Sequence, residues 1–386
     1  MSMSIIRRTV VWILLLIAGI MHVLFANDPT KGCVNELLLQ QKLLQGEPTE
    51  YEKNALVDQG ILKQSLASYK YKPATSEQFV FDRMVEFGFD KDNNPLTCPA
   101  IKREEIKPSL DKYREELNTY YEFIEDFDPI DDLRLHLDHN HTICDKVDLV
   151  PGGLPEIFKS QQLSFTPSGY VEPILPPFRS MNICFESNIN KSLMNLKYLV
   201  HDFGHMCRKL KKTSRNILID IGASLQFHEK EGLLAPPIYL TAIYQKMGFK
   251  FDHIYAFEVA PEEPGKVFEL VPKSLQSAYH WINIGVSSEK GAKNNPLTML
   301  LNDFREDDLI VVKLDIDTGS IEVPLARQVL DDPRFAGLID HFYFEHHMHM
   351  GELASPWGNT TNGTVKESIE LFTGLREKGI ASHYWP

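Results

Sequence analysis

From residue 216 onward the chain alternates between short β-branched runs and amphipathic segments, and this rhythm constrains the fold more than any other feature. Five runs predict strands, at 216–222, 253–258, 280–286, 309–317 and 339–348. Four segments predict helices, at 237–247, 296–304, 321–330 and 365–378, with Gly379 as the cap of the last. Alternation of this kind is typical of parallel strands joined by helical crossovers. We therefore predict an α/β fold with a Rossmann-like, mainly parallel sheet and helices on both faces.

The residues before this region have a different pattern. Residues 28–150 are polar, with candidate helices at 34–44, 50–70, 77–88 and 109–127. The last of these has an apolar stripe at helical spacing, which predicts a buried face formed by Tyr113, Leu117, Tyr120, Ile124 and Phe127. Prolines are frequent from 151 to 177 and prevent a long helix there. We expect a leader (1–27), a helical region (28–150), a proline-rich linker (151–190) and a sheet domain (191–386).

The leader carries the longest apolar run of the chain, at residues 10–26, interrupted by His22. Arg7 and Arg8 precede it, and the positive-inside rule then places the N-terminus in the cytosol. We predict a membrane anchor and a single-pass type II protein whose folded part faces the lumen of the endoplasmic reticulum or Golgi. The alternative is a cleaved signal peptide and a secreted protein. Leu24 stands where cleavage after Ala26 would prefer a small residue, which favours the anchor.

Composition agrees with this compartment. Four sequons for N-glycosylation occur, at Asn140, Asn190, Asn359 and Asn362. The five cysteines include no CxxC pair, so one or two disulfides are expected in an oxidising lumen, with at least one thiol left over. A net charge of −13 repels phosphate backbones, and we expect no nucleic-acid partner.

Two predicted strands end in residues suited to a nucleoside. The first ends in Asp220 and Gly222, and a glycine there lets the backbone turn tightly beside a ligand. The second ends in Glu258, and a carboxylate at that position accepts hydrogen bonds from both ribose hydroxyls. The pair favours nucleoside binding over the alternative, a helix cap and an unrelated surface acid.

The later strands end in ionisable residues. Period-two alternation places Lys313, Asp315 and Asp317 on one face of 309–317. The same alternation places Glu345, His347 and His349 on one face of 339–348. Neighbouring strands would bring Asp315, Asp317, Glu345 and His347 into one pocket. Carboxylates with imidazole suit a divalent cation such as Mg²⁺ or Mn²⁺, with Asp315, Asp317 and His347 as ligands. They also suit general-base catalysis without a metal, by Asp315, His347 or His349.

A second histidine pair lies earlier in the chain. A helix over 191–212 would place His201 and His205 on one face, four residues apart, which is the spacing of metal ligands. No third ligand is evident in the sequence, and we favour a structural or substrate-facing role.

Four blocks together carry a family resemblance. RNILIDIGAS, HIYAFEVAPE, HWINIGVSSEKG and VVKLDIDTGSIEVPL resemble, in order, the blocks of FkbM-type S-adenosylmethionine-dependent methyltransferases. The resemblance covers residues 216–325. It implies a fold of the class I methyltransferase type. The chain departs from the family pattern at Ser224, where the family has Asn, and at Asp317, where it has Glu.

The resemblance also assigns roles to residues. It implies that Asp220, Gly222, Ala223 and Ser224 line the methionine end of S-adenosyl-L-methionine. Glu258 would bind the ribose, and Asp315 and Asp317 would flank the transferred methyl group.

We therefore expect an O-methyltransferase that acts on a carbohydrate or another small hydroxylated acceptor in the secretory pathway. One alternative is a lumenal metal-dependent glycosyltransferase that uses Asp315 and Asp317 as its D-x-D motif. A second is a non-catalytic, membrane-tethered protein with the same fold.

Overall fold

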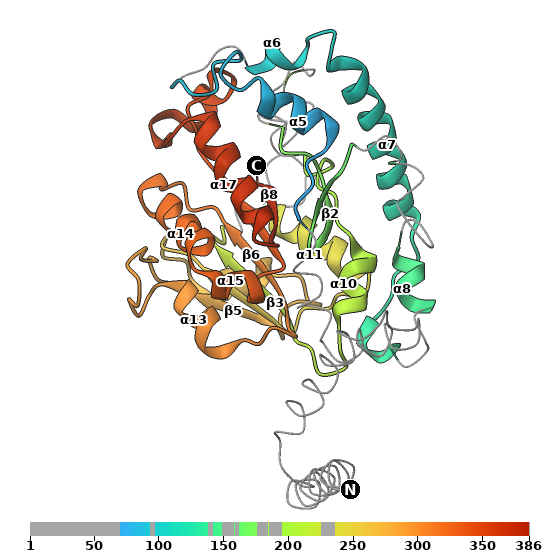
Figure 1. The fold of residues 1–386 in the computed structure, drawn as a ribbon. Coiled ribbons are helices and arrows are strands. Elements are labelled where there is room, and N and C mark those ends of the chain that lie inside the picture. The colour runs from blue at the N-terminus through green and yellow to red at the C-terminus, as the bar shows by residue number, and fades with distance from the viewer. Residues whose placement is uncertain are drawn as a thin grey trace, which may run out of the picture. The chain divides into compact units, whose positions relative to one another are not determined.

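The centre of the molecule is a six-stranded sheet in the order β5-β4-β3-β6-β7-β8, in which every neighbouring pair is parallel (Figure 1). This computed structural model describes residues 70–92, 97–137, 142–148, 158, 162–175, 184, 195–224 and 236–385. They belong to one compact unit, Tyr69–Pro386. The strands are β3 (Asn216–Ile221), β4 (His253–Phe257), β5 (Tyr279–Ile282), β6 (Leu309–Leu314), β7 (His341–Phe344) and β8 (Ala381–Tyr384). The predicted α/β class is confirmed.

Helices cover the sheet in two groups. The chain between β3 and β5 forms α11 (Pro236–Lys246) and α12 (Pro264–Leu270). The chain from β5 to β8 forms α13 (Pro296–Asp303), α14 (Gly319–Asp331), α15 (Pro333–Leu338), α16 (Ala354–Trp357) and α17 (Val365–Glu377). Figure 1 shows α13, α14 and α15 together on one side, and α10 (Phe203–Lys209) and α11 on the other. Right-handed crossovers produce this division when the strand order reverses.

The reversal lies between β3 and β6. From β3 the chain moves outward through β4 to β5, and then returns to the other side of β3 as β6. Both strands are buried along their whole length because helices cover both faces of the sheet. Ligands of such sheets bind at the carboxyl ends of the strands, at the point where the strand order reverses. This edge of the sheet therefore carries the candidate site.

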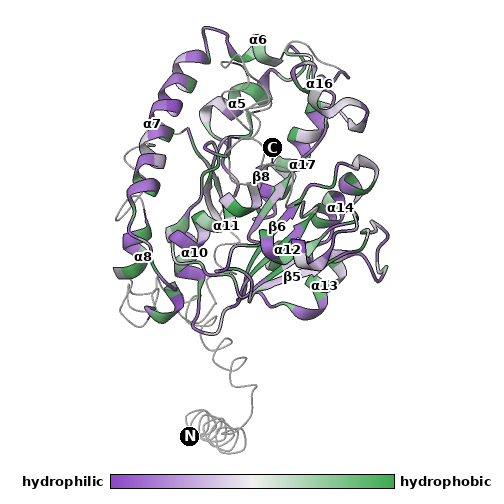
Figure 2. Ribbon diagram, turned by 180° about the vertical axis from the view of Figure 1, so that it is seen from behind, coloured by the Kyte–Doolittle hydropathy of each residue, from purple (hydrophilic) through white to green (hydrophobic). Residues whose placement is uncertain are grey.

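The N-terminal part of the described chain is mainly helical, but the helix predicted at 77–88 ends at Asp82. Its elements are α5 (Thr75–Asp82), α6 (Thr97–Ile101), α7 (Lys107–Asp126), η1 (Leu133–Leu135) and α8 (Thr142–Val147). The predicted stripe of α7 is buried at Tyr113, Leu117, Tyr120 and Ile124, while Phe127 follows the last helical residue. Most of the length of α7 is hydrophilic in Figure 2, consistent with one buried face.

The segment predicted as a proline-rich linker contains a hairpin. Strands β1 (Ser164–Thr166) and β2 (Gly169–Val171) pair antiparallel, and an isolated bridge joins Lys72 to Phe165. Arg376 of α17 is 1% exposed and donates to the Ser164 hydroxyl at 3.0 Å and to the Ser382 carbonyl. This buried arginine links the hairpin to α17 and β8.

The helix predicted over 191–212 was wrong in length. Residues 195–202 are not helical, and α10 spans only Phe203–Lys209. Asp202 stops the helix from extending further back, because its side chain caps the amide of His205 at 2.7 Å. His201 therefore lies outside the helix and does not share a face with His205. Its Nε2 atom instead bonds the hydroxyl of Tyr343 at 2.6 Å.

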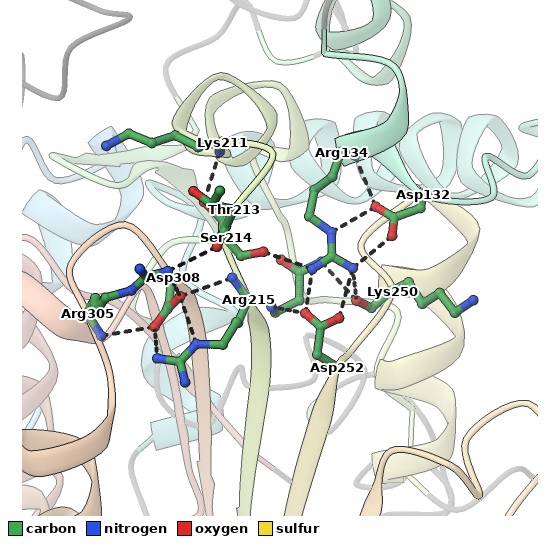
Figure 3. Close-up of polar contacts among 11 residues, drawn as sticks. Asp132, Arg134, Lys211, Thr213, Ser214, Arg215, Lys250, Asp252, Arg305 and Asp308 are labelled. Atoms are coloured by element: carbon green, nitrogen blue, oxygen red, sulfur yellow. Dashed lines mark hydrogen bonds and ion pairs between the residues drawn. The ribbon is translucent and has the colours of Figure 1, made fainter.

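An ion-pair network holds the amino edge of the sheet (Figure 3). Arg134, which follows α7, contacts the carboxylates of Asp132 and Asp252 and donates to the Ser214 carbonyl at 2.8 Å. Arg215 pairs with Asp308, which is fully buried and also accepts the amide of Arg305. Both arginines fix chain segments at the edge opposite the candidate site.

Two disulfides are present, Cys98–Cys184 and Cys144–Cys207. They confirm the expectation of one or two bridges. Cys33 is the remaining cysteine of the sequence and lies outside the described residues.

None of the described helices is long and apolar enough to cross a membrane. The predicted anchor at residues 10–26 lies outside the described residues, as do the candidate helices at 34–44 and 50–70.

Candidate functional site

The ammonium of Lys313 lies between the carboxyl ends of β3 and β6. Lys313 is directly opposite Asp220 in the parallel register, and each side chain is 2% exposed. Its Nζ atom lies 3.1 Å from both Asp220 Oδ1 and Asp315 Oδ2, and donates to the Gly222 carbonyl at 2.6 Å. Burial alone would lower the pKa of Lys313, but the two carboxylates raise it above its usual value. One buried cation thus holds together the turn after β3 and the acid after β6.

The turn after β3 depends on Gly222. Its φ is +91°, and a Cβ atom there would lie 1.5 Å from the carbonyl oxygen of Asp315. The amides of Gly222 and Ala223 both donate to the Phe257 carbonyl, at 2.9 and 3.0 Å. Because Phe257 is the last residue of β4, the glycine turn lies beside Glu258, as the sequence predicted.

Glu258 is partly exposed at the tip of β4. Its Oε1 atom accepts the amide of Ala260 at 2.7 Å, and Asn283 donates to its carbonyl oxygen at 2.7 Å. Two exposed aliphatic side chains flank this position, Val259 at 71% and Ile284 at 44% exposure. The tips of β4 and β5 therefore present a carboxylate between apolar groups at the protein surface.

Asp315 follows β6 and is held on several sides. Its Oδ2 atom accepts the indole N–H of Trp385 at 3.0 Å, in addition to the contact with Lys313. It also shares a hydrogen bond with Glu345. Burial and the nearby charge of Glu345 raise the pKa of Asp315 to about 7, although Lys313 opposes the shift.

A second group of side chains follows β6 and β7. The ligand atoms of Asp317, Glu345 and His347 all lie within 4.8 Å of one another. The Nε2 atom of His347 is 3.0 Å from Glu345 Oε2 and 3.7 Å from Asp317 Oδ1. Glu345 and His347 are buried, whereas the Asp317 side chain is 71% exposed. This group, called the acid–histidine triad below, lies at the same edge as Lys313 because β6 and β7 are neighbours.

Glu322 lies behind the triad, in the first turn of α14. Its carboxylate accepts the amides of Ile316 at 2.7 Å and Thr318 at 3.1 Å, and so fixes the loop that carries Asp317. Burial raises the pKa of Glu322 to about 8, and the charges of Asp315, Glu345 and Asp317 add to the shift.

The structure brings most of the predicted site residues to this edge. Asp317 and His347 lie together with Glu345, whereas Asp315, predicted as the third metal ligand, instead contacts Lys313 and Trp385. Asp220, Gly222 and Ala223 lie beside Lys313 or Glu258. Ser224 is exposed after the glycine turn.

The structure does not bring His349 to the site. Its Nδ1 atom lies 2.9 Å from the Gly363 carbonyl and 3.5 Å from Asp92. The strand predicted over 339–348 ends at Phe344, so the period-two alternation stops before His349.

Three further contacts to the site come from segments that no sequence pattern marked. Trp357 donates its indole N–H to Glu345 at 3.2 Å, and the Thr360 hydroxyl contacts His347 Nδ1. Trp385 contacts Asp315 from beyond β8. The sequence carries no periodic pattern at Trp357, Thr360 or Trp385 that would have predicted these contacts.

A small cavity lies on the α11 face of the sheet and reaches Asp220 near the carboxyl end of β3. Its lining is mainly apolar and includes Leu218, Ile238 and Leu275, with Asp220 and Tyr279 as polar members. An apolar lining of this kind does not suit a charged nucleoside.

No protein-family model, curated protein or solved structure matches this chain. A function is therefore inferred from the residues and their geometry alone.

Proposed function

We propose that this chain is an S-adenosylmethionine-dependent methyltransferase that transfers the methyl group to a hydroxyl of a carbohydrate or another hydroxylated acceptor. The observation that carries the proposal is the contact of the Gly222 turn with the end of β4, beside Glu258. A close backbone approach and a carboxylate at neighbouring strand tips are the two features that hold a nucleoside in doubly wound sheets.

The fold supports the proposal. Numbered from β3, the strand order is 3-2-1-4-5-6, the order of Rossmann-like sheets that bind nucleotides at the reversal point. The nucleoside would lie over the tips of β3 and β4. There Glu258 would accept its ribose hydroxyls, and the exposed side chains of Val259 and Ile284 would contact the apolar faces of the base. This site explains why aliphatic groups are exposed beside a carboxylate.

The acceptor side of the proposal rests on Asp315. In methyl transfer the acceptor oxygen attacks the methyl carbon, and the C–S bond breaks as the O–C bond forms. The electron pair of the broken bond returns to sulfur, which leaves S-adenosylhomocysteine, and the hydroxyl proton passes to a base. A pKa of about 7 suits Asp315 to this role, because a base works best near the ambient pH. His347 lies beside it, whereas His349 has no place in this arrangement.

The same proposal places the folded part in the secretory pathway, either anchored as a type II membrane protein or secreted. Two disulfides support an oxidising compartment, since they are rare in the cytosol. Two of the sequons, at Asn359 and Asn362, lie on exposed residues.

The direct test is transfer of a labelled methyl group from S-adenosylmethionine to a panel of sugars and polyols. We expect transfer by the full chain and its loss in Glu258→Ala. Glu269→Ala is the matched control, because Glu269 is an exposed acid on α12. Equal transfer by both variants, or none by the unaltered chain, would refute the proposal.

The competing function is a glycosyltransferase whose metal binds at the D-x-D residues Asp315 and Asp317. Thermal unfolding distinguishes the two, because a ligand that binds only the folded state raises the melting temperature. We expect a rise with S-adenosylhomocysteine, and no rise with UDP and Mn²⁺ beyond that produced by Mn²⁺ alone. The reverse result would favour the glycosyltransferase, and no rise with either ligand would favour a non-catalytic protein.

A further inference from the structure

We infer that the acid–histidine triad of Asp317, Glu345 and His347 is a divalent-cation site, suited to Mg²⁺ or Mn²⁺, that binds the acceptor hydroxyl. The purpose of the site rests on the proposed function, but its existence is argued from the triad alone. The geometry is suitable. Ligand atoms about 2.1 Å from such an ion lie about 3 Å apart in neighbouring octahedral positions and about 4 Å apart in opposite ones. The separations from His347 Nε2, 3.0 Å to Glu345 and 3.7 Å to Asp317, fall in this range, and all three ligand atoms lie within 4.8 Å of one another.

The hydrogen bonds of His347 determine which of its nitrogens faces the triad. The Thr360 hydroxyl donates its one proton to the Trp357 carbonyl at 2.7 Å. It must therefore accept from His347, so the proton of a neutral imidazole is on Nδ1. The Nε2 lone pair then points at two carboxylates, Glu345 and Asp317. Three electron-pair donors that face one another are stabilised by a cation or a proton between them, and the separations above are those of a divalent-cation site.

Outer contacts hold the ligands as they do in metal sites. In such sites the second ring nitrogen of a ligating histidine donates to a neighbour, which fixes the tautomer and the ring orientation. Here Thr360 has that role for His347, and Trp357 donates to the second oxygen of Glu345 at 3.2 Å. The ring of Trp357 also stacks on the ring of His347, with centroids 4.8 Å apart. Both buried members of the triad are thus oriented by one segment, 357–360.

The charge around the triad favours a cation over apolar or anionic ligands. Glu322 and Asp315 lie within electrostatic reach of Glu345 and Asp317, so four carboxylates surround the position. Lys313 is the cation that pairs with Asp315, and it also pairs with Asp220. Oxygen ligands with a single imidazole suit hard divalent ions rather than soft ones.

A cation at this position would supply what a hydroxyl acceptor needs. A sugar hydroxyl is a weak acid, and an ion that binds its oxygen lowers the pKa of the hydroxyl. The exposed Asp317 leaves the outer side of the ion open to such an oxygen. The acceptor class that fits is a polyol whose adjacent hydroxyls both reach the ion.

The test is a titration of the full chain with Mn²⁺, after dialysis against a chelator, with free Mn²⁺ measured by electron paramagnetic resonance. We expect one saturable site per chain. Asp317→Asn should weaken binding at least about tenfold, and Thr360→Val should weaken it about 10- to 100-fold, the effect typical of outer-shell partners. Asparagine tolerates the positive φ of 55° at Asp317, so this variant keeps the fold. Valine at 360 leaves the sequon of Asn359 intact.

Glu377→Gln is the control and should bind Mn²⁺ unchanged, because Glu377 is exposed at the end of α17 near the opposite edge of the sheet. The inference would be overturned if no saturable site is found, or if Asp317→Asn and Thr360→Val both bind Mn²⁺ as tightly as the unaltered chain does. His347 would then be a partner of Glu345 and not a metal ligand. Binding of S-adenosylhomocysteine without metal, measured on the same samples, reports separately on the proposed function.

Discussion

Replacing Lys313 with Met tests the centre of the site most severely. The variant keeps the volume of the side chain but removes the charge that compensates two carboxylates, Asp220 and Asp315. Removing one partner of a buried ion pair costs about 3–5 kcal/mol of unfolding free energy, because an uncompensated charge remains. Asp220 is buried, whereas Asp315 is partly exposed and keeps some solvent screening. We therefore expect a loss near the lower end of that range at pH 8.

The loss should depend on pH. Burial raises the pKa of Asp315 to about 7 and also raises that of Asp220, so both acids favour the protonated form more in the folded chain than in the unfolded one. Their ionisation therefore lowers the unfolding free energy as pH rises from about 4 through the folded pKa. Without Lys313 the folded-state pKa values of both acids rise further. Between the old and the new pKa of each acid, the unfolding free energy of the variant should therefore fall by about 1.4 kcal/mol per pH unit more than that of the unaltered chain.

The measurement is urea unfolding of the full chain at pH 5 and pH 8. We expect a large gap between Lys313→Met and the unaltered chain at pH 8 and a smaller gap at pH 5. Lys266→Met, at an exposed position on α12, should change stability by less than about 0.5 kcal/mol. A loss below about 1 kcal/mol at both pH values would refute the assigned role of Lys313.

Three other predictions concern the turn, the glycans and the disulfides. Gly222→Ala should destabilise the fold by more than about 2 kcal/mol. Gly291→Ala should cost only the positive-φ penalty of about 1 kcal/mol, since nothing lies within 4 Å of a Cβ at Gly291. Similar melting temperatures for the two variants would contradict this prediction. Secreted or lumenal protein should lose one endoglycosidase-sensitive glycan in Asn359→Gln and none in Asn362→Gln, because the Asn362 amide already donates to the Gly319 carbonyl. The opposite pattern would contradict the reasoning. Reduction of both disulfides should lower the melting temperature, since bridges over 86 and 63 residues each contribute about 2–4 kcal/mol; an unchanged melting temperature would show that they do not stabilise the fold.

The sheet was predictable where both faces are covered. β3 and β6 form near-continuous β-branched runs, as central parallel strands do, and both were predicted at the right place. α17 was predicted to within one residue because its apolar period ends at a glycine with φ of +98°. An element that is buried against its neighbours needs apolar residues at regular positions, and these can be recognised in a single sequence.

β8 was not predicted, because its burial depends on distant partners. Ser382 and His383 are polar residues with no exposed surface, and they are buried because Arg376 and Glu172 bond to them. A run that contains Ser and His has no β-strand signal of its own. The short helices α12 and α15 were also missed, since one or two turns give too few residues for a period.

The sequence predicted the site residues that directly follow the sheet strands, but not those that later connections bring to the site. Parallel pairing of β6 with β7 follows from the alternation, and it places Asp315 and His347 at one edge. Beyond Phe344 the chain leaves the sheet, and His349, predicted as a candidate general base, lies beside Gly363 and Asp92 instead. Thr360 and Trp385 reach the site from connections without periodicity, and only the folded chain shows them.

The most direct test of the central claim is a crystal structure of the full chain with S-adenosylhomocysteine. The account predicts ribose hydroxyls within hydrogen-bond distance of the Glu258 carboxylate, and the homocysteine part over the Gly222 turn. A ligand bound elsewhere, or none at a saturating concentration, would contradict it.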